Sequence, residues 1–302
     1  MTPEITYIFT PICDKFIARA LYTLYKFSKP GSFRVIVIDQ CKEGFSSPVM
    51  SYIQPLIHLY MHPIRNLGYA KAMNEGILHG LHWKTPLICL ANDDIEIINE
   101  SWLDGIHNTF AKDPDRIVGV CPMTPRHAGW GYGVPGYPEV LSYKQKYPQS
   151  DYDYLMNGNF SDKRDILPKT FPVDNLKGTV VDGAVFVMPY FKREIFTEIG
   201  LLDERFFPGS GEDMDFMARA YQKNYRIVST SLSWIWHWWS QSKDLFASGE
   251  LEDPYYKPKD HPYWNNMSEI WSEGHDPWGY HTNNDGTKTL LPRVKDIFVD
   301  QI

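Results

Sequence analysis

Residues 86–94 read PLICLANDD, so an apolar run ends abruptly in one amide and two carboxylates. A short continuous apolar run of this kind is typical of a strand that is buried on both faces of a sheet. The same pattern occurs earlier, where residues 34–39 read RVIVID and again end on an acid. We therefore expect two buried strands whose carboxyl ends carry Asp39 and the acidic group at residues 92–94.

Strand-like runs alternate with helix-like periodicity along much of the chain. Strands are expected at residues 5–10, 34–39, 57–61, 86–91, 117–121, 183–189 and 226–230. Helical spacing of apolar residues begins near Ile17, Gly68, Ser101, Lys192 and Glu212. Continuous apolar strands separated by helices predict an α/β fold with a mostly parallel sheet covered by helices on both faces. In such sheets ligands bind beyond the carboxyl ends of the strands.

Composition narrows the functional classes. The chain has 302 residues, of which 43% are hydrophobic, and a net charge of −7, which disfavours nucleic acid as a partner. Its four Cys residues form no CxxC pair, which argues against a zinc site and fits a reducing compartment. We find no secretory leader and no run near the roughly 18 apolar residues of a membrane span, and so expect a cytoplasmic protein.

Regular patterns disappear between residues 122 and 177. Glycines alternate there with Trp130, Tyr132 and Tyr137, whose rings are candidate stacking surfaces for a ligand. Long irregular stretches in compact domains are usually functional loops or lids, although a rigid loop that covers the sheet is the alternative. We expect residues 1–123 and residues 124–240 to form two halves of one domain, and residues 241–302 to form a C-terminal extension.

Two acidic groups are candidates for chemistry. Carboxylates gathered at residues 92–96 repel one another unless a cation lies among them, and oxygen ligands suit Mg²⁺ or Mn²⁺. A solvated acidic turn is the alternative. The second group, Glu212 and Asp213, lies at a predicted helix start, where acids also act as caps. One of these two carboxylates is a candidate general base.

Two further segments add to this picture. His237 lies among tryptophans after a predicted strand, which keeps a metal-ligand role open for it. Gly68 precedes a predicted helix, and its backbone would let a ligand approach a helix N-terminus that attracts phosphate.

Together these segments, across roughly residues 5–242, resemble glycosyltransferase family 2 on the GT-A fold. Residues 66–77 are similar to the family's N-x-G-x-A-x-A-x-N-x-G-I helix start, and residues 92–94 to its DXD-type metal motif with Asn in the first place. Residues 193–219 resemble the segment that contains the ED motif. His237 with Ser240 or Ser242 resembles the late H-x-x-x-S element. The loops after the first two strands depart from the family pattern, since Asp39-Gln40-Cys41 keeps only the leading acid.

The resemblance implies an inverting, metal-dependent transferase that uses a nucleotide-diphosphate sugar, for which we expect a UDP-sugar, and the hydroxyl group of a glycan. It implies that Asp213 is the base and that Glu212 binds hydroxyl groups. The metal would be Mn²⁺ or Mg²⁺, and its predicted ligands are Asp94, His237 and Glu96. The predicted donor-binding residues are Thr10, Pro11, Asp39, Asn66, Gly68, Lys71, Asn92 and Asp93. The resemblance also implies that residues 1–123 bind the nucleotide sugar and that residues 124–240 form the acceptor-binding and catalytic half of the same domain, with the rings at residues 130, 132 and 137 beside the acceptor.

Two other functions compete with this one. A nucleotidyltransferase would also use acids at a strand end with Mg²⁺, but would be expected to carry a Gly-rich basic first loop, which residues 11–16 lack. The second is a non-catalytic glycan-binding relative. The joint presence of Asp94, Asp213 and His237 argues against it.

Overall fold

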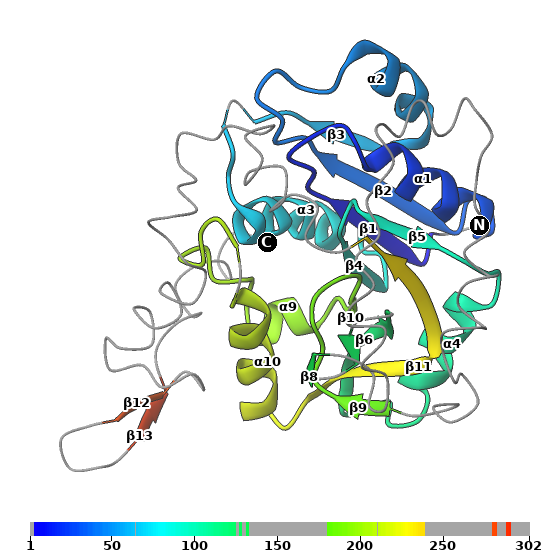
Figure 1. Cartoon of the computed structure of the whole chain (residues 1–302). Coiled ribbons are helices and arrows are strands. Elements are labelled where there is room, and N and C mark those ends of the chain that lie inside the picture. Colours follow the sequence, from blue (N-terminus) through cyan, green and yellow to red (C-terminus); the bar gives the residue numbers. More distant parts are fainter. Residues whose placement is uncertain are drawn as a thin grey trace.

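The computed structural model describes residues 3–63, 65–124, 127–128, 131–132, 180–209, 211–238, 280–282 and 288–290. A nine-stranded sheet runs through the described part in the order β3-β2-β1-β4-β10-β6-β11-β5, with β9 paired to β11 (Figure 1). Its strands are β1 (Ile5–Phe9), β2 (Phe33–Ile38), β3 (Leu59–Met61), β4 (Leu87–Ala91), β5 (Ile95–Ile97), β6 (Ile117–Met123), β9 (Val180–Asp182), β10 (Tyr190–Lys192) and β11 (Arg226–His237). Two small hairpins stand apart from it, formed by β7 (His127–Ala128) with β8 (Gly131–Tyr132) and by β12 (Tyr280–Thr282) with β13 (Lys288–Leu290).

Helices cover both faces of this sheet. They are α1 (Ile17–Lys26), α2 (Ser47–Ile53), the 3-10 helix η1 (Gln54–Leu56), α3 (Tyr69–Trp83), α4 (Trp102–Phe110), α9 (Ile195–Glu198) and α10 (Glu212–Gln222). Side chains of α1, α2 and α4 join one hydrophobic cluster, and those of α3, α9 and α10 join a second. Successive side chains of a strand point to opposite faces, so Tyr7 of β1 belongs to the first cluster and Ile8 to the second. The predicted α/β fold with helices on both faces is confirmed.

The strand directions explain how the sheet positions a site. β1, β2, β3 and β4 pair in parallel, and so do β6 and β11. β10, β5 and β9 run in the opposite direction. The carboxyl ends of β1, β2 and β4 therefore meet at one edge of the sheet. Because β10 pairs with both β4 and β6, the sheet continues from the first half of the chain into the second.

One predicted strand is wrong. Residues 183–189 do not form a strand but an irregular crossing between β9 and β10. Phe186, Val187 and Met188 are buried in it, so the apolar run reflects burial and not pairing. Gly183 has a φ of 88°, which ends β9.

Other expectations fall outside the described residues. They concern Trp130, Tyr132 and Tyr137 as side chains, most of the irregular stretch, the serines after His237, and nearly all of the extension at residues 241–302. These expectations stay predictions.

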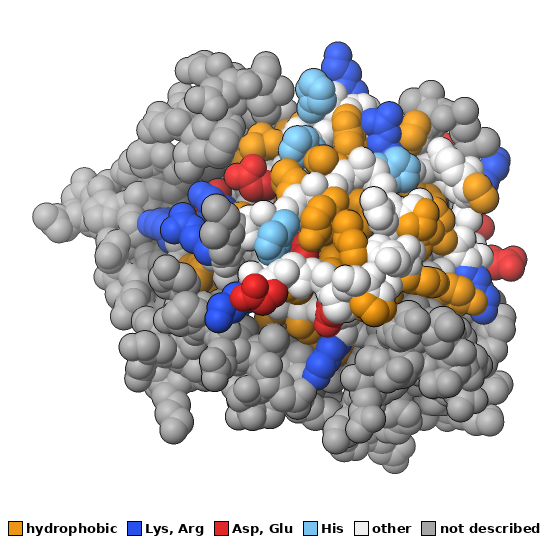
Figure 2. Space-filling view, turned by 90° about the horizontal axis from the view of Figure 1, so that it is seen from above, with side chains coloured by type: hydrophobic (Ala, Val, Ile, Leu, Met, Phe, Trp, Pro, Cys, Tyr) orange, Lys and Arg blue, Asp and Glu red, His pale blue; other side chains and the backbone are white. Residues whose placement is uncertain are grey.

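None of the helices in the described part has the length and apolarity that a membrane crossing requires. On the face seen from above, over α2 and β3, the described Lys and Arg side chains lie mainly toward the rim around a hydrophobic middle with His side chains (Figure 2).

Candidate active site

Gln40 connects the loops that follow the first two strands. Its backbone N–H donates to the Pro11 carbonyl at 2.8 Å, and its side-chain amide donates to the Thr10 carbonyl at 3.2 Å. Its Oε1 accepts the N–H of Leu67 at 2.7 Å. Three loops at the carboxyl edge, including the one that precedes α3, are thus held by a single side chain. The sequence alone gave no signal for this role, because Gln40 occupies a place where the family pattern has another residue.

Asp39 follows β2 and is fully buried. Its carboxylate accepts the N–H groups of Cys41 and Phe45, each at 2.9 Å, and the hydroxyl of Tyr60 at 2.6 Å. Burial, followed by this hydrogen bond with Asp39, raises the pKa of Tyr60 above its ordinary value. In the described conformation Asp39 organises the loop after β2, and its contact with a donor base stays a prediction.

Asp94 and His237 face each other across the edge of the sheet. His237 Nε2 lies 3.0 Å from Asp94 Oδ1, and their side chains are only 7% and 9% exposed. Asn92 Nδ2 lies 3.5 Å from the same imidazole nitrogen. The antiparallel pairing of β5 with β11 places Ile95 opposite His237, and the N–H of Trp238 donates to the Asp94 carbonyl at 2.9 Å. The backbone therefore fixes the two side chains against each other.

The pair fits a divalent cation. The 3.0 Å between the two atoms is that of a direct hydrogen bond or ion pair, and it is also about the separation of adjacent ligands around an octahedral cation with bonds of about 2.1 Å. A carboxylate oxygen and an imidazole nitrogen suit Mn²⁺. Among the described residues no group of three or more His, Cys, Asp or Glu side chains gathers around one such position. A cation here would take its remaining ligands from water or from substrate phosphates.

Glu96, which we expected as a third metal ligand, bonds two other side chains in the structure. Its Oε1 accepts Nη1 of Arg19 at 2.9 Å and the indole N–H of Trp238 at 2.8 Å. Arg19 is fully buried, so it needs a buried anion beside it. Glu96 thus neutralises an interior cation of α1, and its part in binding a metal stays a prediction.

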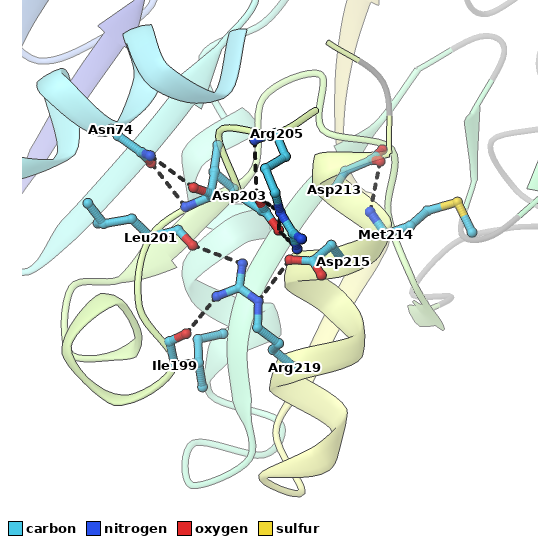
Figure 3. A network of polar contacts seen from close by, with 10 residues as sticks. Asn74, Ile199, Leu201, Asp203, Arg205, Asp213, Met214, Asp215 and Arg219 are labelled. Atoms are coloured by element: carbon cyan, nitrogen blue, oxygen red, sulfur yellow. Dashed lines mark hydrogen bonds and ion pairs between the residues drawn. The ribbon is translucent and has the colours of Figure 1, made fainter. Parts of the chain in front are cut away.

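Glu212 and Asp213 begin α10, directly after Gly211 with its φ of 101°. Asp213 Oδ1 accepts the N–H of Met214 at 2.8 Å (Figure 3). Burial raises the pKa of Asp213, and backbone N–H groups, first that of Met214, offset only part of this rise. The pKa of Tyr69 is raised first by its burial and then by the charges of Glu212 and Asp213, so the start of α3 lies near the start of α10.

Gly68 contacts protein where we expected a phosphate. A Cβ at this position would lie 2.7 Å from the Phe207 ring, and the backbone has a φ of 77° and a ψ of 166°. The first N–H of α3, that of Tyr69, donates to the Pro208 carbonyl at 2.8 Å. The loop before α10 therefore covers this helix N-terminus. Asn66 closes the same turn, because its Oδ1 accepts the Gly68 N–H at 2.8 Å.

The segments at residues 66–77 and 193–219 form one scaffold (Figure 3). Buried Asn74 donates to the Leu202 carbonyl at 2.9 Å and accepts the Leu202 N–H at 3.0 Å. Arg219 bonds Asp215 at 2.9 Å and the carbonyls of Ile199 and Leu201 at 2.6 and 2.8 Å. Lys71, a predicted donor-binding residue, pairs with Glu204 at 3.1 Å on the surface. Both segments thus support the start of α10, where Asp213 lies.

The fold is an α/β sheet covered by helices on both faces, and the Asp94–His237 pair lies beyond the carboxyl end of β4, at the edge where sheets of this kind bind ligands. Residues 8–199 match the family described as "Glycosyl transferase family 2". Since the match covers more than half of the chain, the chain belongs to glycosyltransferase family 2. This membership confirms the predicted family and leaves the nucleotidyltransferase alternative without support. Comparison with curated protein sequences gave no match.

The fold is similar to that of several solved structures. GalNAc-T7 with UDP, GalNAc and Mn²⁺ superposes with a TM-score of 0.57 at 13% identity, covering 91% of this chain and 49% of that one. Mannosyltransferase PcManGT from Pyrobaculum calidifontis, in complex with GDP-Man and Mn²⁺, gives 0.50 at 14% identity, covering 89% and 70%. TarS 1-349 from S. aureus gives 0.48 at 15%, covering 90% and 74%. The chain spans about half the length of the GalNAc-T7 structure, and at these identities the likeness shows the fold alone.

Proposed function

We propose that this chain is an inverting, metal-dependent glycosyltransferase that moves a sugar from a nucleotide-diphosphate sugar to a hydroxyl group of a glycan. The observation that carries the proposal is the 3.0 Å approach of His237 to Asp94 beyond the end of β4. Support comes from family membership and from two proteins of similar fold, of which one was solved with UDP and Mn²⁺ and the other with GDP-Man and Mn²⁺.

Asp94 and His237 would hold Mn²⁺ or Mg²⁺, with Asn92 and Asp93 beside them on the same turn. The cation would neutralise the negative charge of the diphosphate leaving group. The protein's own part is to keep the two ligand atoms at the edge of the sheet and mostly out of water. Donor contacts are proposed for the loops at Thr10–Pro11 and Asn66, which Gln40 connects through its side chain and backbone. We propose a UDP-sugar as the donor.

Asp213 would accept the proton of the acceptor hydroxyl as that oxygen attacks the anomeric carbon from the side opposite the diphosphate. A base acts best when its pKa is near the working pH, and burial raises the pKa of Asp213 in that direction. Glu212 is mostly buried beside it and would bind hydroxyl groups of a substrate. All four cysteines are buried free thiols, which supports the cytoplasm as the proposed location.

Release of nucleoside diphosphate from a panel of UDP- and GDP-sugars tests this function. The parent, Asp94→Asn and the matched control Asp104→Asn are compared in Mn²⁺ and in EDTA. Asp104 is an exposed acid in the first turn of α4, so its variant makes the same chemical change away from the site. We expect release that requires Mn²⁺ in the parent and the control and is lost in Asp94→Asn. Release that is unaffected by EDTA would contradict the proposal, and nucleotide-sugar binding without any release or transfer would favour the glycan-binding relative.

A further inference from the structure

A fully buried cation lies behind the Asp94–His237 pair. Arg19 projects from α1 with 0% of its surface exposed, and its Nη1 lies 2.9 Å from Glu96 Oε1. Burying an arginine is costly unless an anion and hydrogen bonds compensate for its lost hydration. A second α1 side chain, Thr23, accepts the N–H of Ile97 through its hydroxyl at 3.0 Å. Helix α1 is therefore fastened to β5, the strand that directly follows Asp94.

Trp238 is held by the same buried pair. Its indole N–H donates to Glu96 Oε1 at 2.8 Å, so one carboxylate oxygen serves both Arg19 and Trp238. The Arg19 guanidinium carbon lies 5.3 Å from the centroid of the Trp238 ring, within the range of a cation–π contact. The Trp236 ring packs edge-on against the same indole, with 5.8 Å between the ring centroids and an interplanar angle of 71°. Trp238 is thereby fixed by polar, cationic and aromatic contacts.

Trp238, which these contacts hold in place, directly follows His237 in the chain. The N–H of Trp238 donates to the Asp94 carbonyl at 2.9 Å, so the backbone beside one member of the pair is bonded to the backbone of the other. Moving the Trp238 ring would move this backbone and with it the imidazole. A site with two such ligands depends strongly on their mutual placement, because among the described residues no third His, Cys, Asp or Glu side chain joins them.

We propose that Arg19, Glu96 and Trp238 form a positioning cluster that keeps His237 aligned with Asp94 for a divalent cation. This inference rests on the proposed function, because it assigns the cation to that pair. Its members contact one another and reach the pair through the backbone beside His237, so we assign them as positioning residues. Partners in the shell behind metal ligands typically change metal affinity by on the order of 10- to 100-fold when they are removed.

The test compares Trp238→Phe with Trp234→Phe. Both variants lose an indole N–H and the same volume from neighbouring parts of the chain, but the Trp234 indole donates to the Ser231 carbonyl at 2.8 Å, away from the pair. Mn²⁺ affinity in the presence of UDP is measured for full-length protein from the EPR signal of free Mn²⁺, together with thermal melting. We expect Trp238→Phe to bind Mn²⁺ about 10-fold more weakly than the parent, and Trp234→Phe to match the parent even if both variants melt earlier.

Equal Mn²⁺ affinities in the two variants would overturn the positioning role while leaving the proposed function intact. A parent that binds no Mn²⁺ would overturn both. If Trp238→Phe does not fold, Arg19→Lys replaces it, because lysine keeps the charge beside Glu96 but loses the planar group over the Trp238 ring. Weaker Mn²⁺ binding by Arg19→Lys supports the cluster, and unchanged binding contradicts it.

Discussion

His237 Nε2 lies 3.0 Å from Asp94 Oδ1, although the two residues belong to distant parts of the sequence. The short strand β5 explains the approach, because it follows Asp94 directly and pairs with the end of β11. The geometry of the pair therefore follows from how these two strands pair. We expect replacements at the site to change the chemistry and replacements in the surrounding scaffold to change stability.

Replacement of Asp94 should remove the chemistry but keep the fold. Asp94→Ala deletes one of the two proposed ligands, so transfer and the Mn²⁺-dependent stabilisation by nucleotide should both be lost. A cooperative melting transition should persist, because the turn that carries Asp94 is also held by its backbone bond to Trp238. Transfer assays and melting curves check this. Normal turnover by the variant in EDTA-treated buffer would exclude the metal role.

Asp213→Asn is nearly isosteric but cannot take a proton. A lost general base typically costs on the order of 10²–10⁴-fold in rate, so we expect a fall of that size with donor affinity retained. In the parent, the rate should decline on the acid side with a pKa above that of an ordinary aspartate, because burial raises this pKa. Equal rates in variant and parent would transfer the role to Glu212.

Asp213→Asn should lower the rate but raise the stability of the folded chain near pH 7. Since the pKa of Asp213 is higher in the folded chain, the folded state holds its proton more tightly than the unfolded state. The ionised carboxylate therefore lowers stability above the unfolded pKa, and this loss disappears as the pH falls. Asp213→Asn should melt at a higher temperature than the parent near pH 7, with the difference shrinking in acid. A lower melting temperature at pH 7 would contradict the assigned direction.

Asn74 and Lys71 lie on α3, and both contact Glu204. Their replacement by alanine should lower the free energy of unfolding by very different amounts. Asn74→Ala leaves the buried N–H and carbonyl of Leu202 without their partner, at a cost of about 1–3 kcal/mol for each such group. Lys71→Ala removes a surface ion pair worth about 0–1 kcal/mol. Urea unfolding of both variants measures the two free energies. Similar losses would show that Asn74 does not hold the loop as described.

Gly68→Ala should destabilise the chain more than Gly31→Ala does. Both glycines have a φ of 77°, but a Cβ at Gly31 meets nothing within 4 Å, whereas one at Gly68 lies 2.7 Å from the Phe207 ring. A side chain at positive φ alone costs about 1–2 kcal/mol. The difference between the two variants in urea unfolding reports the contact with Phe207 together with the backbone of Gly68, whose ψ of 166° at positive φ is a conformation found essentially only for glycine. Equal losses of unfolding free energy would mean that the loop before α10 moves to make room for the added Cβ at no measurable cost.

Much of the fold could be predicted because buried strands in parallel sheets are continuous apolar runs, as at residues 34–39 and 86–91. The strand predicted at residues 183–189 was wrong for the same reason, since an irregular buried crossing is equally apolar. The three-residue strand β5 is too short for a periodic signal. Arg19 gave none either, because a charged residue on an amphipathic helix is normally expected in water, yet it is fully buried.

The candidate site was harder to predict than the fold. The position of Asp94 followed from the end of its strand, whereas its approach by His237 needed the family resemblance. Periodicity does not show which distant strand will pair with β5. The contact of Glu96 with Arg19 could not be predicted, because sequence spacing does not show which acid in a cluster faces a buried arginine. The Gly68 turn was expected to face phosphate, since Phe207 is far away in the sequence and its contact appears only in the folded chain.

The central claim is that Asp94 and His237 share a divalent cation that a nucleotide diphosphate needs for binding. Calorimetric titration of the parent and of Asp94→Asn with UDP, and in parallel with GDP, in Mn²⁺ and then in EDTA tests it most directly. We predict that one nucleotide binds the parent in Mn²⁺, and that its binding is lost in EDTA and in the variant. Equal binding of that nucleotide with and without Mn²⁺, or undiminished binding by Asp94→Asn, would contradict the claim.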